Sequence, residues 1–172
     1  VKELLSDRSA VFFPEENCRF SQNILVGLSE WQNLAGDPTT VDIVHWNCGH
    51  WDMAHWRGDE KPLNSPAYYG EMIERIDGHL QRCFPNAKRV FALTTPMNPD
   101  GSRPVNVRTT DDVRTYNAVA RSVMNKLGVP VNDLFALMEK APSTLYADYC
   151  HYTEAGYRIL AQQVAQTIRG ML

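Results

Sequence analysis

The sequence predicts an α/β domain in which helices cover both faces of a central parallel sheet. Short apolar segments that suit buried strands alternate along the chain with longer segments of helical periodicity. Such alternation is typical of parallel sheets, because each crossover between parallel strands needs a long connection, usually a helix. No internal repeat or linker divides the chain, so we expect residues 1–172 to form a single domain.

Four short apolar segments are predicted to be the strands of this sheet. Pro14 and Pro96 follow the first and the third of them, and proline ends a strand because it lacks an amide hydrogen. We expect all four to lie parallel in one sheet. The predicted strands are residues 9–13, 41–46, 89–93 and 129–132.

The helices are predicted from apolar residues that recur every three or four positions, each run preceded by a capping residue. Ser21, Ser65, Asp133 and Thr153 are suited to begin four of them, and Pro66 suits the first turn of the second. The predicted helices are residues 21–36, 66–80, 111–127 and 134–138, and a last helix that follows Thr153.

The start of the chain differs from the usual order of this architecture. Residues 1–5 resemble the end of a helix, whereas a doubly wound domain usually begins with a strand. We therefore expect that a first strand, with the turn after it, lies outside this sequence or never existed in it.

Composition excludes several classes of function. A net charge of −3 argues against general binding of nucleic acid. No apolar run approaches the roughly 18 residues that a membrane span needs. The four cysteines lack CxxC spacing and are expected to be thiols, which slightly favours the cytoplasm, although the compartment stays open because the N-terminus could be trimmed.

The functional residues are expected at the carboxyl ends of the strands, where sites of parallel α/β sheets lie. The loops at that edge are residues 14–20, 47–64, 94–110 and 141–152. The last of these contains Asp148 and His151. An acid three residues before a histidine, at the entrance to a helix, suits a catalytic base and the carboxylate that orients it. The alternative is that Asp148 caps nearby amides and that His151 is an ordinary loop residue.

These segments, taken in order, resemble the SGNH, or GDSL-type, hydrolases. Asp148-x-x-His151 matches the acid–base block of that family, and residues 42–52 match its Gly-x-Asn-Asp block with Gly49 and Asp52 in register. Residues 14–21 occupy the place of the second block. Three further segments resemble a subgroup of the superfamily: residues 94–96, 116–117 and 132–134. The resemblance implies a three-layer α/β/α fold with the flavodoxin-like strand order of SGNH hydrolases.

The resemblance also implies an esterase or acylhydrolase that uses serine, histidine and aspartate. The Gly-Asp-Ser block that carries the nucleophile in that family is missing here, so the serine is expected outside this sequence. Cys18 stands where the family has a glycine whose amide donates to the oxyanion, and Trp51 stands where the family has its oxyanion asparagine. Asn47 and Asn17 are candidates for that role, and the alternative is that both hold loops through backbone contacts.

Other residues of these loops carry weaker hypotheses. His45, His50, Asp52 and His55 lie close in sequence, but buried or stacked histidines are a better interpretation than a metal site. The tryptophans of the same stretch suit a core or subunit contact, or a wall for a sugar or acyl group. Cys18 or Cys48 could act as a thiolate, whereas Cys150 is expected to point away from His151. Arg103 and Arg108 could meet a carboxylate or sulfate, or could be solvated charges.

We therefore predict an ester hydrolase that removes an O-acyl or O-acetyl group from a small molecule or carbohydrate, without a cofactor. The serine would attack, His151 would carry the proton and Asp148 would orient His151. The alternative is a non-catalytic SGNH-like binding or scaffold domain. A homo-oligomer stays open.

Overall fold

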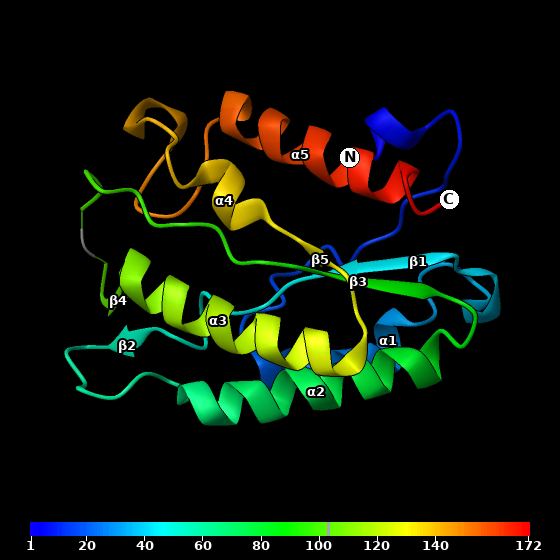
Figure 1. Cartoon of the computed structure of the whole chain (residues 1–172), viewed down its shortest axis with the longest axis horizontal. Helices are drawn as coiled ribbons and strands as arrows, with labels where there is room; N and C mark the ends of the chain where they lie inside the picture. Colours follow the sequence, from blue (N-terminus) through cyan, green and yellow to red (C-terminus); the bar gives the residue numbers. More distant parts are fainter. Residues whose placement is uncertain (103) are drawn as a thin grey trace.

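A parallel sheet forms the centre of the fold (Figure 1). The computed structural model describes residues 1–102 and 104–172. The sheet has the strand order β1 (Ile43–Trp46), β3 (Lys88–Ala92) and β5 (Val131–Asn132). Both pairings are parallel, so the carboxyl ends of the three strands lie at one edge, as the sequence predicted.

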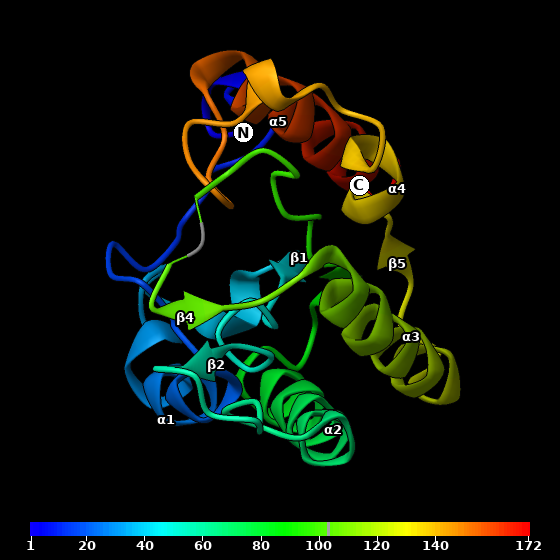
Figure 2. The ribbon, with the colours of Figure 1, turned by 90° about the vertical axis from the view of Figure 1, so that its left-hand side faces the viewer.

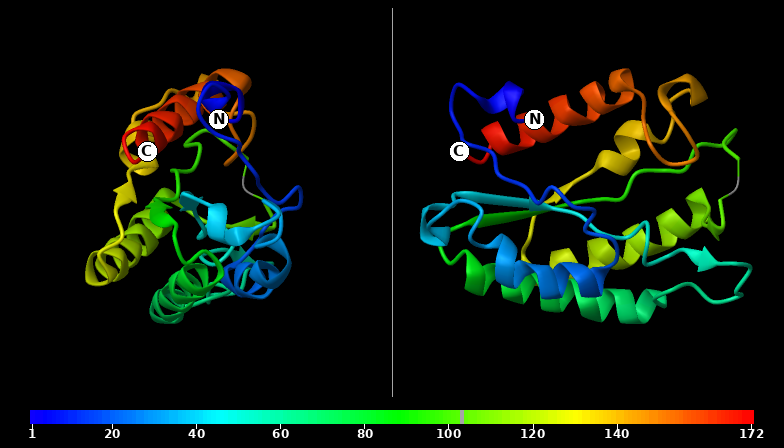
Figure 3. Two further views of the ribbon diagram at one scale, coloured as in Figure 1. Left: turned by 90° about the vertical axis from the view of Figure 1, so that its right-hand side faces the viewer. Right: turned by 180° about the vertical axis from the view of Figure 1, so that it is seen from behind.

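Helices cover both faces of this sheet, which makes three layers and confirms the predicted class. On one side lie α1 (Ser21–Trp31), α2 (Pro66–Cys83) and α3 (Thr110–Leu127). On the other side lie α4 (Leu134–Met138), α5 (Glu154–Arg169) and the short N-terminal 3-10 turn η1 (Glu3–Leu5) (Figures 2 and 3). Further 3-10 turns span Pro38–Thr40 (η2) and Ser143–Leu145 (η3).

The caps predicted for the helices account for most of their boundaries. Ser65, Asp133 and Thr153 each accept a hydrogen bond from a backbone amide of the first turn that follows. Gly128 ends α3 in the left-handed conformation, with φ of 67°, which glycine adopts without steric cost. Ser21 differs from its prediction. Phe20 is the cap of α1, and Ser21 is its first residue, because the Ser21 hydroxyl bonds a distant carboxylate instead.

The prediction of a strand at residues 9–13 is wrong. Residues 9–14 form neither helix nor strand in the structure. A strand needs a neighbour with which its amides and carbonyls can pair, and β1, at an edge of the described sheet, pairs only with β3. Apolar composition alone therefore did not make this segment a strand.

A groove of about 820 Å³ separates residues 8–14 from β1. The exposed rings of Phe12 and Phe13 line it on one side, and residues 43–47 line it on the other. Val164 and Ile168 of α5 also border it. The edge of β1 that has no partner in the described sheet thus borders this apolar groove.

A second, two-stranded ribbon lies at the carboxyl edge of the sheet and was not predicted. It pairs β2 (His55–Trp56) with β4 (Asn106–Val107) in antiparallel fashion. The ribbon joins two of the loops expected to hold the site, residues 47–64 and 94–110. It fixes where the residues that follow β4 enter α3.

The main core lies between the sheet and the helices α1 to α3. Tyr69, Ile73 and Ile76 of α2 and Phe91 of β3 are completely buried there. A smaller cluster of Met138, Tyr146 and Tyr152 supports the loop before α5. Among the described residues, no helix combines the length and apolarity that crossing a membrane requires.

Candidate functional site

A tight loop before α5 brings Asp148 and His151 together. The Oδ1 atom of Asp148 accepts hydrogen bonds from the backbone amides of Cys150 at 2.8 Å and of His151 at 2.7 Å. Tyr146 and Tyr152 pair across the base of the loop, and both rings are buried. The short spacing of the acid and the histidine is therefore bent into a turn rather than an extended segment.

The predicted contact between Asp148 and His151 is confirmed. Oδ2 of Asp148 lies 2.6 Å from Nδ1 of His151. Partial burial pushes the pKa of Asp148 upward, but the two amides and the ring of His151 outweigh it and lower this pKa to about 2. The carboxylate is thus ionised at neutral pH and fixes the proton of His151 on Nδ1, which leaves Nε2 for a reacting group.

Cys150 does not point away from His151, contrary to the expectation from sequence. Because the loop turns tightly, the Cys150 sulfur lies 3.7 Å from Nδ1 of His151. Burial raises the pKa of this thiol, although Arg108 opposes the rise. Nδ1 is already engaged by Asp148, so the imidazole is not placed to activate Cys150 as a nucleophile.

Arg108, His50 and Tyr149 border the dyad on the side of the ribbon. The Nη2 atom of Arg108 lies 3.2 Å from the Tyr149 hydroxyl, and Nε lies 3.4 Å from Nδ1 of His50. Burial lowers the pKa of His50 to about 3, and the charges of Arg108 and His151 add to this effect. His50 is therefore a neutral ring beside Arg108.

Asn47 and Gly49 lie where β1 ends. The Asn47 amide donates to the carbonyl of Ala92 at 2.7 Å and to Oγ1 of Thr94 at 3.2 Å, so it joins the ends of β1 and β3. Gly49 has φ of 146°, and a Cβ there would lie only 2.6 Å from Oγ1 of Thr94. The site therefore needs glycine at this position for space as well as conformation.

Asp52 and Trp51 follow in the same loop. Asp52 is completely buried, and its carboxylate accepts from the Ser21 hydroxyl at 2.6 Å and from the Asn64 amide at 2.6 Å. Burial raises the pKa of Asp52 and these hydrogen bonds oppose the rise. Trp51 stacks at a tilt against Trp56, with ring centroids 5.6 Å apart. Asp52 thus ties the start of α1 to this loop.

Asn17 and Cys18 lie on the loop that leads into α1. Oδ1 of Asn17 accepts from the amide of Arg19 at 2.8 Å, which bends the loop and accompanies a φ of 53° at Arg19. Cys18 is half-buried and, with Asn47, lines the large groove beside β1. The structure therefore brings Cys18 and Asn47, two candidate oxyanion residues, to one cavity.

The four residues weighed as metal ligands are engaged separately. His45 contacts Asn132, and His55 contacts the carbonyl of Asp59, while His50 and Asp52 have the partners given above. A different set comes closer together, since ligand atoms of Asp148, Cys150 and His151 lie within 4.8 Å of one another. Among the described residues, only these three have ligand atoms close enough to bind one metal ion together. Asp148 and His151 already contact each other through Oδ2 and Nδ1.

Residues 94–96 and 116–117 were matched to the family from the sequence, but no role was given to them. Asn117 of α3 clamps the backbone of Thr94 by donating to its carbonyl at 2.8 Å and accepting from its amide at 3.0 Å. Tyr149 had no hypothesis attached to it, although it adjoins the acid of the dyad. Arg103, which was weighed together with Arg108, lies outside the described residues.

Comparison with known families identifies the chain's relatives. The sequence pattern of the GDSL-like Lipase/Acylhydrolase family matches residues 18–159. This match spans both the loop of Cys18 and the Asp148–His151 turn. None of the curated proteins compared with the chain matches it.

Several solved structures share the fold. A lipase/acylhydrolase from Enterococcus faecalis is 20% identical with a TM-score of 0.68, and the match covers 88% of this chain and 71% of that one. A GDSL-like lipase from Bacteroides thetaiotaomicron is 18% identical with a TM-score of 0.68, over 90% and 73% of the two chains. An acetyl xylan esterase is 16% identical with a TM-score of 0.72, over 97% and 87%. At these identities the likeness concerns the fold alone.

Proposed function

The chain belongs to the GDSL-like lipase/acylhydrolase family, and we propose that the intact protein hydrolyses an ester, with His151 as base and Asp148 as its orienting acid. The observation that carries the proposal is the 2.6 Å contact between Oδ2 of Asp148 and Nδ1 of His151. The side chain of His151 is 60% exposed, so its free ring edge is accessible to a substrate. Family membership supports acyl chemistry at this dyad.

In the proposed mechanism, Nε2 of His151 takes the proton of a serine hydroxyl as the serine oxygen bonds to the ester carbonyl carbon. The carbonyl oxygen becomes an oxyanion, and the imidazolium formed is stabilised by the ionised Asp148. His151 then protonates the leaving alcohol as its bond to carbon breaks. A water molecule, deprotonated in turn by His151, releases the acid and restores the serine.

We place this serine outside the 172 residues, at the end of a strand that would lie beside β1. The apolar groove of about 820 Å³ along β1 supports this placement, because an added parallel strand could pair with the open edge there. Cys18 and Asn47 line the groove. A serine at the carboxyl end of the added strand would therefore lie among candidate oxyanion donors.

For the oxyanion we favour the backbone amide of Cys18 over the side chain of Asn47. A backbone donor does not depend on the side chain, whereas both amide hydrogens of Asn47 have acceptors in Ala92 and Thr94. Asn17 offers a further amide on the Cys18 loop. Each preset donor of this kind typically contributes roughly 3–4 kcal/mol to lowering the barrier.

For the substrate we propose an O-acetyl or other short O-acyl group on a carbohydrate. Trp51, on the loop that follows β1, forms an aromatic pair with Trp56 of β2, and Trp56 is 37% exposed. Aromatic faces of this kind suit the flat apolar face of a sugar ring. The structural neighbour described as an acetyl xylan esterase acts in the same chemical class.

The test is a chromogenic acetyl ester assay on two proteins: the 172 residues alone, and the same chain with the coding sequence that precedes it. We expect turnover only in the longer protein, and His151→Ala should lower its kcat/KM by roughly a thousandfold or more. His79→Ala, on α2 and away from the Asp148 loop, is the matched control and should retain activity.

Two outcomes would count against this proposal. Enzyme-like turnover by the 172 residues alone, abolished by His151→Ala, would mean that another nucleophile serves the dyad, and Cys18 and Cys48 would be substituted next. A longer protein that carries the serine, folds and still hydrolyses no ester would favour the non-catalytic binding domain.

A further inference from the structure

A buried arginine lies next to the dyad. Arg108 is only 7% exposed, although arginine is rarely buried without a partner of opposite charge. It stands between β4 and the cap of α3 at Thr109, so secondary structure holds its backbone on both sides. Its guanidinium is thus presented to the site by fixed elements rather than by a free loop.

Neutral groups make all the contacts recorded for this guanidinium. It donates to the Asn106 carbonyl at 3.1 Å and, at 3.2 to 3.4 Å, to groups of His50, Tyr149 and Cys150. It also stacks on the Tyr149 ring, 4.9 Å from the centroid. The low pKa of His50, due mainly to burial, and the raised pKa of the Cys150 thiol keep both groups uncharged.

No carboxylate lies within 4.0 Å of Arg108 among residues 1–102 and 104–172. Arg108 forms no ion pair with the residues of that part of the chain. Asp148, the acid of the adjoining loop, instead binds His151 and two backbone amides. Burial of a cation without a counter-ion is costly, because the charge loses its hydration.

One donor of Arg108 and one of His50 lack a partner among the described residues. A guanidinium has five N–H groups, and the four contacts above leave one on Nη1. His50 accepts at Nδ1, so its proton is on Nε2, a buried atom without a partner among the described residues. A cavity of about 180 Å³, lined by Arg108 and Tyr149 but not by His50, gives room for a small group beside the guanidinium.

We propose that Arg108 binds a carboxylate of the substrate, so that the preferred esters are those of acidic molecules such as acylated uronic acids. The inference rests on the proposed function, since it names the substrate class of the same site. A planar guanidinium suits a carboxylate, and charge-assisted bonds are about twice as strong as neutral ones. The bound carboxylate would supply the counter-ion that Arg108 lacks.

The kinetic test uses two matched pairs of esters and the longer, active protein. Acetylated methyl glucuronoside is compared with acetylated methyl glucoside, and 4-nitrophenyl hydrogen succinate with 4-nitrophenyl butyrate. The first pair places the carboxylate on the alcohol and the second on the acyl group. We expect kcat/KM to favour the charged member of one pair by roughly 10–100-fold.

Variants assign that preference to Arg108. Arg108→Gln should abolish the preference in kcat/KM for the charged ester, and Arg108→Lys should retain part of it. Arg75→Gln changes an exposed arginine of α2 and should leave the preference unchanged. No preference in either pair, or a preference that survives Arg108→Gln, would overturn the inference while leaving the esterase proposal intact.

A binding measurement separates this inference from the esterase proposal. Glucuronate and glucose are titrated calorimetrically into the same protein with His151→Ala. Binding of glucuronate but not glucose, lost with Arg108→Gln and kept with Arg75→Gln, would support the carboxylate site even if no ester were hydrolysed. Equal binding of the two sugars, or none, would contradict it even if esters were hydrolysed.

Discussion

Single buried side chains decide much of the electrostatics of this site. His45 and His50 both lie near the end of β1, and burial lowers their pKa values to about 4 and about 3. The pKa of Asp148 also falls, to about 2, because hydrogen-bond donors surround its carboxylate. For an acid, a lower pKa favours the charged form. At neutral pH these two half-buried histidines are therefore neutral, whereas the acid of the dyad is charged.

Neutral His45 makes stability depend on pH. The unfolded chain takes up the His45 proton near pH 6.5, whereas the folded chain takes it up only near pH 4. The contribution is thus complete above pH 6.5 and is lost as the pH falls towards 4. His45→Gln removes this titration, so we expect its melting temperature to fall less than that of the parent protein between pH 6.5 and 4. Thermal unfolding at several pH values measures this, with His79→Gln as control. Parallel curves for the parent and His45→Gln would refute it.

Asp148→Asn tests the orienting role of the acid in the active protein. The amide oxygen of asparagine can still accept from the amides of Cys150 and His151, but its NH2 group cannot accept the Nδ1 proton of His151. We expect kcat to fall by roughly 10²–10⁴-fold. Asp100→Asn changes an exposed acid of another loop and serves as the control. Steady-state ester hydrolysis is the measurement, and unchanged kcat would remove Asp148 from the mechanism.

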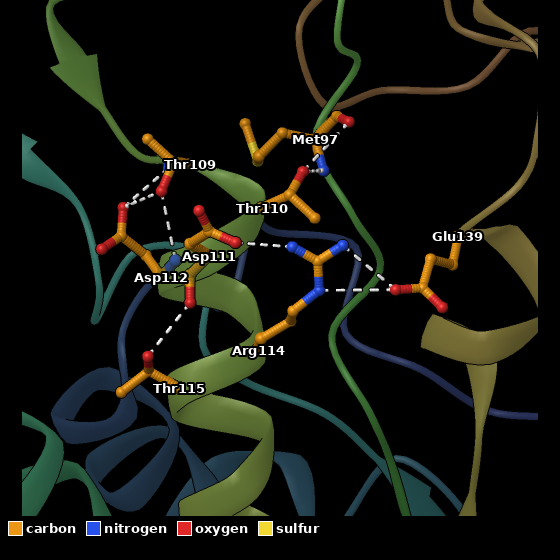
Figure 4. Close-up of polar contacts among 8 residues, drawn as sticks. All are labelled: Met97, Thr109, Thr110, Asp111, Asp112, Arg114, Thr115 and Glu139. Atoms are coloured by element: carbon orange, nitrogen blue, oxygen red, sulfur yellow. Dashed lines mark hydrogen bonds and ion pairs between the residues drawn. The ribbon is translucent and has the colours of Figure 1, made fainter.

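At the scale of elements, the first turn of α3 connects the site to the rest of the fold. Figure 4 shows the capping box in which Thr109 and Asp112 bond each other's backbone amides. Arg114, one turn further along α3, pairs with Asp111 of the first turn and with Glu139, the residue that follows α4, the latter at 3.1 Å. This cap directly follows Arg108, so the helix start also holds the buried arginine.

We expect Thr109→Ala to lower the free energy of unfolding by about 1 kcal/mol, because an amide of the first turn loses its acceptor. Thr115→Ala is the matched control on the same helix. Its hydroxyl bonds only the carbonyl of Asp111, which helix bonding can use as well, so its effect should stay within about 0.5 kcal/mol. Urea denaturation measures both variants, and equal losses would show that the cap has no special role.

At the scale of the whole molecule, the dominant feature is the open edge of β1 with its apolar groove. Unpaired strand edges and exposed apolar patches favour binding of another strand or chain. Phe12 and Phe13, 55% and 59% exposed, stand at this groove. We expect the proposed additional strand to occupy the groove and to cover these rings.

The 172-residue protein should therefore bind a fluorescent hydrophobic dye, and Phe12→Ser should weaken that binding because it removes a ring from the groove. Val105→Ser changes a residue that is 61% exposed and does not line the groove, and should leave the fluorescence unchanged. The longer protein should bind less dye than the 172 residues. Equal fluorescence of the parent, the Phe12 variant and the longer protein would contradict this view of the groove.

The sequence by itself determined the features whose causes are local. Helix periods, the caps at Ser65 and Thr153, and the contact of Asp148 with His151 depend on residues within a few positions of one another, and all of these were predicted. The parallel arrangement of β1, β3 and β5 also followed from the alternation of strands and helices.

Only the tertiary structure decided the features that depend on distant partners. Residues 9–13 have strand-like composition but pair with no strand of the described residues, and the β2–β4 ribbon pairs loops about 50 residues apart. Arg108 meets His50 and Cys150 across 58 and 42 positions. Which segments pack together decides how backbones pair, which charges are buried and which side chains meet. Local periodicity in the sequence does not specify these long-range contacts.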